Sequence, residues 1–249
     1  MKQPSIKIKP SSTLWQIAHL VYVVLLPIIL YVCVNRGLVL LGIGFVVLSK
    51  WRVFAIRPRY WAASLRANAV DLSVGVSTAI FMSQTQSALI QLVWAASYAF
   101  WLIVIKTLSS TVGVSIQALI AFVYGLMAIY LFFGGSPIWV LMVLTWALCY
   151  SAAHHFLSSF EELHIKFIAN VFAFFGAALT WILSHWLLFY GIVAQPALLL
   201  MIIGIYLSIL YVLHKYQRLS PMLKTIILLF LTFSVTLIII FSDWSDKTL

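Results

Sequence analysis

The sequence is short of charge, and of negative charge above all. Only 8% of its 249 residues are charged, and five Asp and Glu stand against 15 Lys and Arg, which gives a net charge of +10. A soluble domain typically has about 25% charged and about 45–50% apolar residues. This chain is 64% hydrophobic, with a mean hydropathy of +1.12. The composition therefore excludes a soluble globular domain and indicates an integral membrane protein.

Cysteine is scarce as well. Cys33 and Cys149 are the only two, and both lie inside apolar runs, so we predict neither a disulfide framework nor a Cys-x-x-Cys metal site. The runs also lack the alternation of polar and apolar residues that is typical of an outer-membrane barrel. We expect no cleavable signal peptide, because the first apolar run is longer than an h-region and no small-x-small site follows it.

Continuous apolar runs recur along the whole chain, and a helix needs about 20 apolar residues to cross a hydrocarbon core about 30 Å thick. We expect an all-α bundle of about nine transmembrane helices, forming one domain over residues 14–242. A basic tail, 1–13, precedes it and a short tail, 243–249, follows. The runs cover residues 14–34, 38–56, 68–83, 87–105, 112–133, 137–157, 165–190, 196–213 and 221–241.

Local signals refine some of these helices. The second run is the weakest, because Lys50 and Arg52 interrupt it. We expect both side chains, like that of Lys106, to extend toward the lipid headgroups. Ser136-Pro137 and Ser220-Pro221 each have the order of an N-cap and a first-turn proline, and they predict the starts of the sixth and ninth helices.

Basic residues gather in alternate connections between the runs. With a cytoplasmic N-terminus, 13 of the 15 Lys and Arg face the cytoplasm, and only Arg36 and Lys247 face outward. The positive-inside rule therefore predicts a multi-pass protein of the cell (cytoplasmic or inner) membrane with its C-terminus outside. We expect these residues to contact the lipid bilayer and its anionic headgroups at the cytoplasmic face, and no nucleic acid. Protein partners and a homo-oligomer are left open.

One stretch concentrates reactive side chains. His154, His155, Glu161, Glu162 and His164 lie within eleven residues, at the cytoplasmic end of the sixth run. Imidazole nitrogens and carboxylate oxygens together suit zinc or iron, and Glu161 and His164 have the Glu-x-x-His spacing of di-iron helices. These five residues, which we call the polar node, are a candidate metal or catalytic site. A pH-responsive element is an alternative.

A structural role would also explain the acids of the node. Ser158-x-x-Glu161 and Ser159-x-x-Glu162 both fit capping boxes at the start of the seventh helix, and Glu162 and Lys166 fit a pair four residues apart. Helix capping does not explain why three histidines lie in the same stretch. Whether the node binds a metal or any cofactor is not determined by the sequence.

Glu161-Glu162-x-x-x-Lys166 and Trp181-x-x-x-His185 loosely resemble the EExxxR and FxxxH motifs of the CAAX-processing intramembrane protease family. In that family these glutamates and histidines gather at the catalytic centre. Here lysine replaces arginine, tryptophan replaces phenylalanine, and the later HxxxN motif is missing. A straight helix would also place Glu161 and His185 roughly 36 Å apart. We therefore do not adopt this resemblance.

The third run is the most polar, and Asn68, Asp71 and Thr78 make it a candidate intramembrane polar site. An ionisable residue inside a span is a functional hypothesis by default. Asp71 is close in sequence to Arg59 and Arg66, so an ion pair with one of them is the structural alternative.

Three classes of function remain. The first is a small-solute or ion permease that uses the third run, the second a membrane-embedded enzyme with its site at the node, and the third a non-catalytic scaffold or assembly subunit. We prefer the permease, because nine spans with almost no mass outside the membrane leave little other surface with which to work.

The charge distribution makes a testable prediction of topology. A cysteine introduced at Thr13 should be labelled only from the cytoplasmic side, and one at Thr248 only from outside, in a background without the two native cysteines. Labelling of both positions from the same side would contradict an odd number of spans.

Overall fold

The computed structural model describes residues 13–51, 57–160, 162–186, 189–190 and 193–241, and it is 84% helical. The described part contains α-helices, two 3-10 turns (η2 and η4), one π-helical turn (η3) and a two-stranded hairpin. In chain order these are α1 (Thr13–Asn35), α2 (Val39–Leu48), η2 (Pro58–Tyr60), α3 (Trp61–Ser83), α4 (Ala88–Phe100), η3 (Trp101–Ile105), α5 (Thr111–Phe133), α6 (Ile138–Ser158), α7 (Ile165–Leu183), η4 (Ser184–Trp186), β1 (Phe189–Tyr190), β2 (Val193–Ala194), α8 (Gln195–Lys215) and α9 (Pro221–Ile240).

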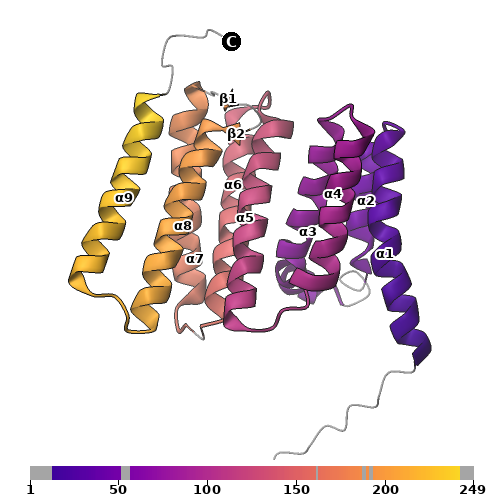
Figure 1. Cartoon of the computed structure of the whole chain (residues 1–249), viewed down its shortest axis with the longest axis horizontal. Helices are drawn as coiled ribbons and strands as arrows, with labels where there is room; N and C mark the ends of the chain where they lie inside the picture. The colour runs from indigo at the N-terminus through magenta and orange to yellow at the C-terminus, as the bar shows by residue number, and fades with distance from the viewer. Residues whose placement is uncertain (1–12, 52–56, 161, 187–188, 191–192, 242–249) are drawn as a thin grey trace, which may run out of the picture.

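The α-helices stand side by side, and successive helices run in opposite directions (Figure 1). In this view the N-terminal end of α1 lies at the lower end of the bundle and the C-terminal end of α9 at the upper end. The C-terminal ends of α2, α4, α6 and α8 and the N-terminal ends of α3, α5, α7 and α9 all lie toward the lower end of this view. Described Lys and Arg residues lie in or next to each of the connections between these ends, namely Lys50, Arg57, Arg59, Lys106, Lys166, Lys215 and Arg218. Positive charge therefore gathers at one end of the bundle, which we call the basic end.

Six described helical stretches are long and apolar enough to cross a membrane: residues 88–105 and the helices α5 to α9. The fold is thus all-α and compatible with a multi-pass membrane protein. Helix α2 has only 10 residues and reaches about 15 Å, so the predicted second span is shorter than expected; residues 52–56 lie outside the described part. The count of nine spans and the sides on which the termini lie remain predictions.

Two apolar cores hold the helices together. One is formed by α1 to α4 and η3, with Ala121 of α5 at its edge, and the other lies within α5 to α8. Glycines allow the closest approaches in both. A Cβ on Gly75 of α3 would lie 2.6 Å from Val46 Cγ1 and 2.7 Å from the Tyr98 hydroxyl. A Cβ on Gly176 of α7 would lie 2.7 Å from Cys149 Sγ. Small residues let membrane helices pack closely in this way.

The two cores meet where α3 packs against α5. Phe81, Trp94 and Tyr124 form an aromatic group there, with ring centroids 4.8–6.0 Å apart. Helix α9 lies at the edge of the bundle and packs against α8, and Ile238 is the one buried residue of α9. The second half of the bundle is therefore a four-helix core with α9 along its side.

The two predicted serine caps have different outcomes. The hydroxyl of Ser220 accepts a hydrogen bond from the Leu223 amide at 3.1 Å, which confirms the predicted start of α9. The prediction for Ser136 is wrong, because α6 begins one residue later, with Pro137 at its N-cap and no side-chain capping bond. A proline at the N-cap position leaves the preceding serine outside the helix.

Candidate functional site

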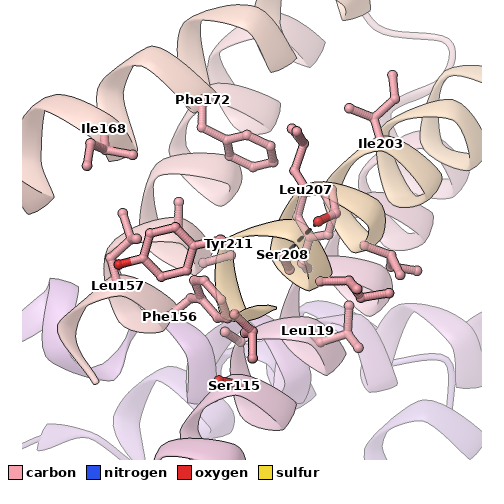
Figure 2. A pocket seen from close by; sticks show the side chains of 18 of the residues that line it. Ser115, Leu119, Phe156, Leu157, Ile168, Phe172, Ile203, Leu207, Ser208 and Tyr211 are labelled. Carbon is pink, nitrogen blue, oxygen red and sulfur yellow. Dashed lines mark hydrogen bonds between the residues drawn. The ribbon is translucent and has the colours of Figure 1, made fainter. Parts of the chain in front are cut away.

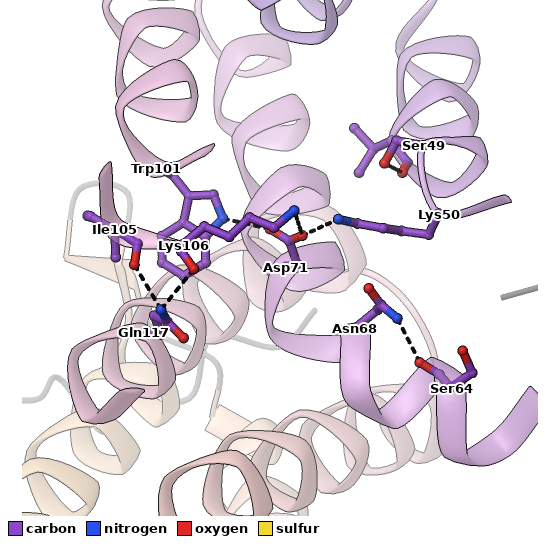
Figure 3. A network of polar contacts seen from close by, with 10 residues as sticks. Ser49, Lys50, Ser64, Asn68, Asp71, Trp101, Ile105, Lys106 and Gln117 are labelled. Atoms are coloured by element: carbon purple, nitrogen blue, oxygen red, sulfur yellow. Dashed lines mark hydrogen bonds and ion pairs between the residues drawn. The ribbon is translucent and has the colours of Figure 1, made fainter. Parts of the chain in front are cut away.

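Asp71 lies at a junction of three helical segments at the basic end of the bundle (Figure 3). It is only 8% exposed. Its Oδ2 atom pairs with the ammonium of Lys50, from the turn after α2, and with that of Lys106 at 2.5 Å. Its Oδ1 atom accepts a hydrogen bond from Trp101 Nε1 at 2.8 Å. Two lysines and an indole thus surround one buried carboxylate.

The π-helical turn η3 is what brings two of these groups together. The Lys106 amide donates to the Trp101 carbonyl at 2.9 Å, a bond that spans five residues. In a regular α-helix, side chains five positions apart point about 140° away from each other. The wider π turn reduces this angle, so Trp101 and Lys106 both reach Asp71. Single π turns of this kind occur often at functional sites.

The predicted partners of Asp71 are wrong. The guanidinium of Arg59 lies over the Tyr60 ring at 4.6 Å, and that of Arg66 lies 5.6 Å from the centroid of the Tyr150 ring. The expectation that Lys50 and Lys106 only extend to the headgroups is wrong as well, because both bind the carboxylate. These lysines are far from Asp71 in sequence, so the pairing depends on how the helices pack.

The other two residues of the predicted intramembrane site bond within their own helix. The Asn68 amide donates to the Ser64 carbonyl at 2.9 Å, and the Thr78 hydroxyl donates to the Val74 carbonyl at 2.8 Å. Thr78 is fully buried. The structure therefore brings neither side chain into the described contacts of Asp71.

Gln117 of α5 connects this junction to the polar node. Its amide nitrogen donates to the carbonyls of Ile105 and Leu108 at 2.8 and 2.9 Å, which satisfies the end of the π turn. Its amide oxygen accepts a hydrogen bond from His155 Nε2 at 3.1 Å. His155 therefore has a bonding partner on α5, which sequence reasoning missed; a glutamine inside an apolar run is the signal that points to such a buried bond.

The described residues of the polar node point in different directions. His155 bonds to Gln117, and the His154 ring lies 5.8 Å from the Tyr150 ring. His164 is the N-cap residue of α7 and is exposed. Glu161 lies outside the described residues. Within the described part of the chain, no three His, Cys, Asp or Glu side chains are close enough to share a metal ion.

Glu162 joins the turn between α6 and α7 to α8. Its Oε1 atom accepts hydrogen bonds from the Tyr211 hydroxyl at 2.5 Å and the Lys215 ammonium at 2.7 Å. The predicted pairing with Lys166 is therefore wrong. The bonds from Lys215 and Tyr211 hold the pKa of the Glu162 carboxyl below its usual value, because they stabilise its charged form.

The predicted capping box of Ser159 and Glu162 is also wrong. The hydroxyls of Ser158 and Ser159 donate to the carbonyls of His155 and Phe156 at 2.7 and 2.8 Å. The two hydroxyls therefore bond to carbonyls in the last turn of α6. They do not cap the start of α7, which has no side-chain cap. The partner predicted for Ser158, Glu161, lies outside the described residues.

A large pocket lies between α5, α6, α7 and α8, and Figure 2 shows the side chains around it. Its volume is about 880 Å³, and its lining on α8 runs from Leu200, in the second turn of that helix, to Tyr216 just after its end. Its wall is almost entirely apolar. The hydroxyls of Ser115 and Ser208 donate to carbonyls of their own helices, Thr111 and Gly204, at 2.8 and 2.7 Å.

Aromatic rings close the pocket at its basic end. The rings of Phe156, Phe160, Tyr211 and Tyr216 contact one another, mostly edge to face, with centroids 5.2–6.3 Å apart. The Tyr211 hydroxyl points out of this group to Glu162. Sequence reasoning missed the pocket, because its apolar residues follow the same pattern as residues that face lipid.

Helix α7 keeps apart the glutamate and the histidine that carry the protease resemblance. His185 belongs to η4 after the last turn of α7, and Glu162 precedes its first turn. The 19 residues of α7 separate them by about 28 Å.

Comparison of the chain with protein-family models, with curated proteins and with solved structures finds no match.

We predict that Asp71→Asn lowers the free energy of unfolding by about 2–4 kcal/mol. Removing one partner of a buried ion pair leaves uncompensated charge, and the partial exposure of Lys106 reduces the cost. Unfolding in detergent would measure it. Lys50→Met in the Asp71→Asn background should recover part of the loss, and Asn68→Ala is the matched control. An unchanged stability for Asp71→Asn would contradict the role of the junction.

We predict that the contact of Glu162 with α8 is lost in acid. Since the pKa of Glu162 is lowered in the folded protein, its contribution to stability is complete above the ordinary glutamate pKa of about 4.3 and disappears as the pH falls through the lowered value. The melting temperature of the wild type should therefore fall more, between neutral pH and about pH 3, than that of Glu162→Gln. Parallel curves for the two proteins would refute the prediction.

Proposed function

We propose that this protein binds a long apolar molecule, a lipid or a lipid-linked compound, in the pocket between α5 and α8. The observation that carries the proposal is the apolar wall of a pocket of about 880 Å³ within a chain of membrane-compatible helices. Ligand pockets typically measure about 300–1,000 Å³ and often lie between the helices of bundles. A ligand dissolved in the bilayer would reach this one without crossing water.

The length of the pocket favours a chain-like ligand. Its lining on α8 extends from Leu200 to Tyr216, which corresponds to about 24 Å along the helix axis. One leaflet contributes roughly 15 Å, half of a hydrocarbon core of about 30 Å. An acyl or isoprenoid chain that lies along α8 would therefore fit, and a compact polar solute would leave most of the wall without contacts.

A polar group beyond the basic end of the pocket favours an amphiphile whose head lies at that end. The Tyr211 hydroxyl, the Glu162 carboxylate and the Lys215 ammonium form a polar group next to the pocket's aromatic end. The hydroxyls of Ser115 and Ser208 are already donated to backbone carbonyls. The pocket wall thus offers mainly apolar contacts to a tail along its length, with a charged and hydrogen-bonding group beyond the rings.

This proposal restricts the kind of solute that the permease favoured by the sequence would carry. An ion or polar-solute path needs polar groups that face the solute, whereas the polar atoms of Asp71, Thr78 and Gln117 are engaged with other protein groups. We therefore propose that transport by this chain, in the cell membrane predicted from its charges, concerns a lipid-soluble molecule. The enzyme and scaffold alternatives have no comparable observation in their favour.

Photolabelling can test the pocket. The full chain in lipid nanodiscs would be exposed to a long-chain fatty acid that carries a diazirine near its end, and the labelled peptides mapped. Labelling should concentrate on α5 to α8 and fall when unlabelled fatty acid is added. Ser115→Phe with Ser208→Phe should abolish most of this labelling, because the rings fill the pocket.

Leu229→Phe is the control for this experiment, since Leu229 is 63% exposed on α9, away from the pocket. It should leave the labelling unchanged. If the label instead follows lipid exposure, and α9 is modified as strongly as α5 to α8, the proposed function is wrong.

A further inference from the structure

A second hollow lies between α3, α5 and α6, and it shares no lining residue with the pocket between α5 and α8. This groove has a volume of about 600 Å³. Apolar side chains make most of its wall, and the serines at 73, 77 and 151 add hydroxyls. Arg66 lies in its wall on α3, close to the basic end of the bundle. The groove is therefore apolar along its length with one cationic side chain.

Arg66 has no acidic partner within the described part of the chain. The described acids are Asp71 and Glu162, and each is already paired with lysine. The guanidinium of Arg66 lies over the Tyr150 ring at 5.6 Å, in a cation–π contact. A half-buried guanidinium in this setting favours an anion from outside the chain.

Two more basic side chains, His154 and Lys166, lie near Arg66 at this end of the groove. The ring of His154 lies 5.8 Å from that of Tyr150. Arg66 and Lys166 both interact electrostatically with His154, so α3, α6 and α7 each contribute a nitrogen-bearing group here. The two described carboxylates, those of Asp71 and Glu162, are paired with other lysines. The local potential is therefore positive.

We propose that this groove binds an anionic phospholipid, with its phosphate on Arg66 and one acyl chain along α3. Arg is suited to the phosphate because its planar fork can donate two parallel hydrogen bonds. From Arg66 to Ile80, the last lining residue on α3, the helix rises about 21 Å. That length matches one leaflet of roughly 15 Å plus the headgroup region.

Native mass spectrometry can test the site. The full chain would be released from nanodiscs that contain phosphatidylcholine and phosphatidylglycerol. The wild type should retain phosphatidylglycerol in preference to phosphatidylcholine. Arg66→Gln should weaken this retention about five- to tenfold, since one basic group near the surface contributes about 1 kcal/mol and a bidentate contact more.

Arg59→Gln is the matched control. Arg59 also lies over a tyrosine ring, at 4.6 Å from that of Tyr60, but it does not line the groove. This variant should retain phosphatidylglycerol like the wild type. Equal losses for Arg59→Gln and Arg66→Gln would overturn the proposal, because they would reflect net charge alone.

Two further measurements separate a lipid from a free phosphate and from the other pocket. Ala147→Trp, which fills the groove and keeps Arg66, should also release phosphatidylglycerol, and glycerol phosphate alone should not compete. Competition by glycerol phosphate, or unchanged retention in Ala147→Trp, would overturn the acyl-chain part of the proposal. Ser115→Phe with Ser208→Phe should leave phosphatidylglycerol bound, so failure of one site does not decide the other.

Discussion

Asp71 is the one acidic residue in the first 160 positions of the chain, and the attachment of the turn after α2 and of η3 to α3 depends on it. A carboxylate taken out of water costs several kcal/mol unless charged and hydrogen-bonding partners surround it. Here Lys50 follows the shortest helix, α2, and Lys106 follows the π turn. The two least regular parts of this half of the bundle are thus attached to α3 by the same carboxylate.

Polar contacts continue from this junction into the second half of the bundle. Gln117 satisfies the end of the π turn and receives the hydrogen bond of His155, so α5 and α6 are joined to η3 at the basic end. Glu162 then joins the turn after α6 to α8. Two polar attachments at the basic end therefore join helices that line the pocket between α5 and α8.

Hydropathy and charge predicted the helices and the gathering of basic residues, because each depends on residues close together in sequence. The cap at Ser220 is local in the same sense, and it was confirmed. The partners of Asp71 and Glu162 were wrongly predicted because those pairs join segments 21 to 53 residues apart. No residue pattern marks the π turn. The pocket could not be predicted either, since side chains that line it and side chains that face lipid are equally apolar.

The shortage of acidic residues in the sequence bears directly on the charge of the groove at Arg66. Five acids cannot neutralise 15 bases, and the two described acids are taken by lysines at the two attachments. The remaining positive charge of the basic end has to be balanced from outside the protein, and the anionic headgroups of a cytoplasmic leaflet carry the opposite sign at the same depth. Helices α5 and α6 separate the groove, which has a cation, from the pocket, whose wall has none. A lipid held by its phosphate and a ligand held by its tail would therefore occupy opposite sides of the same two helices.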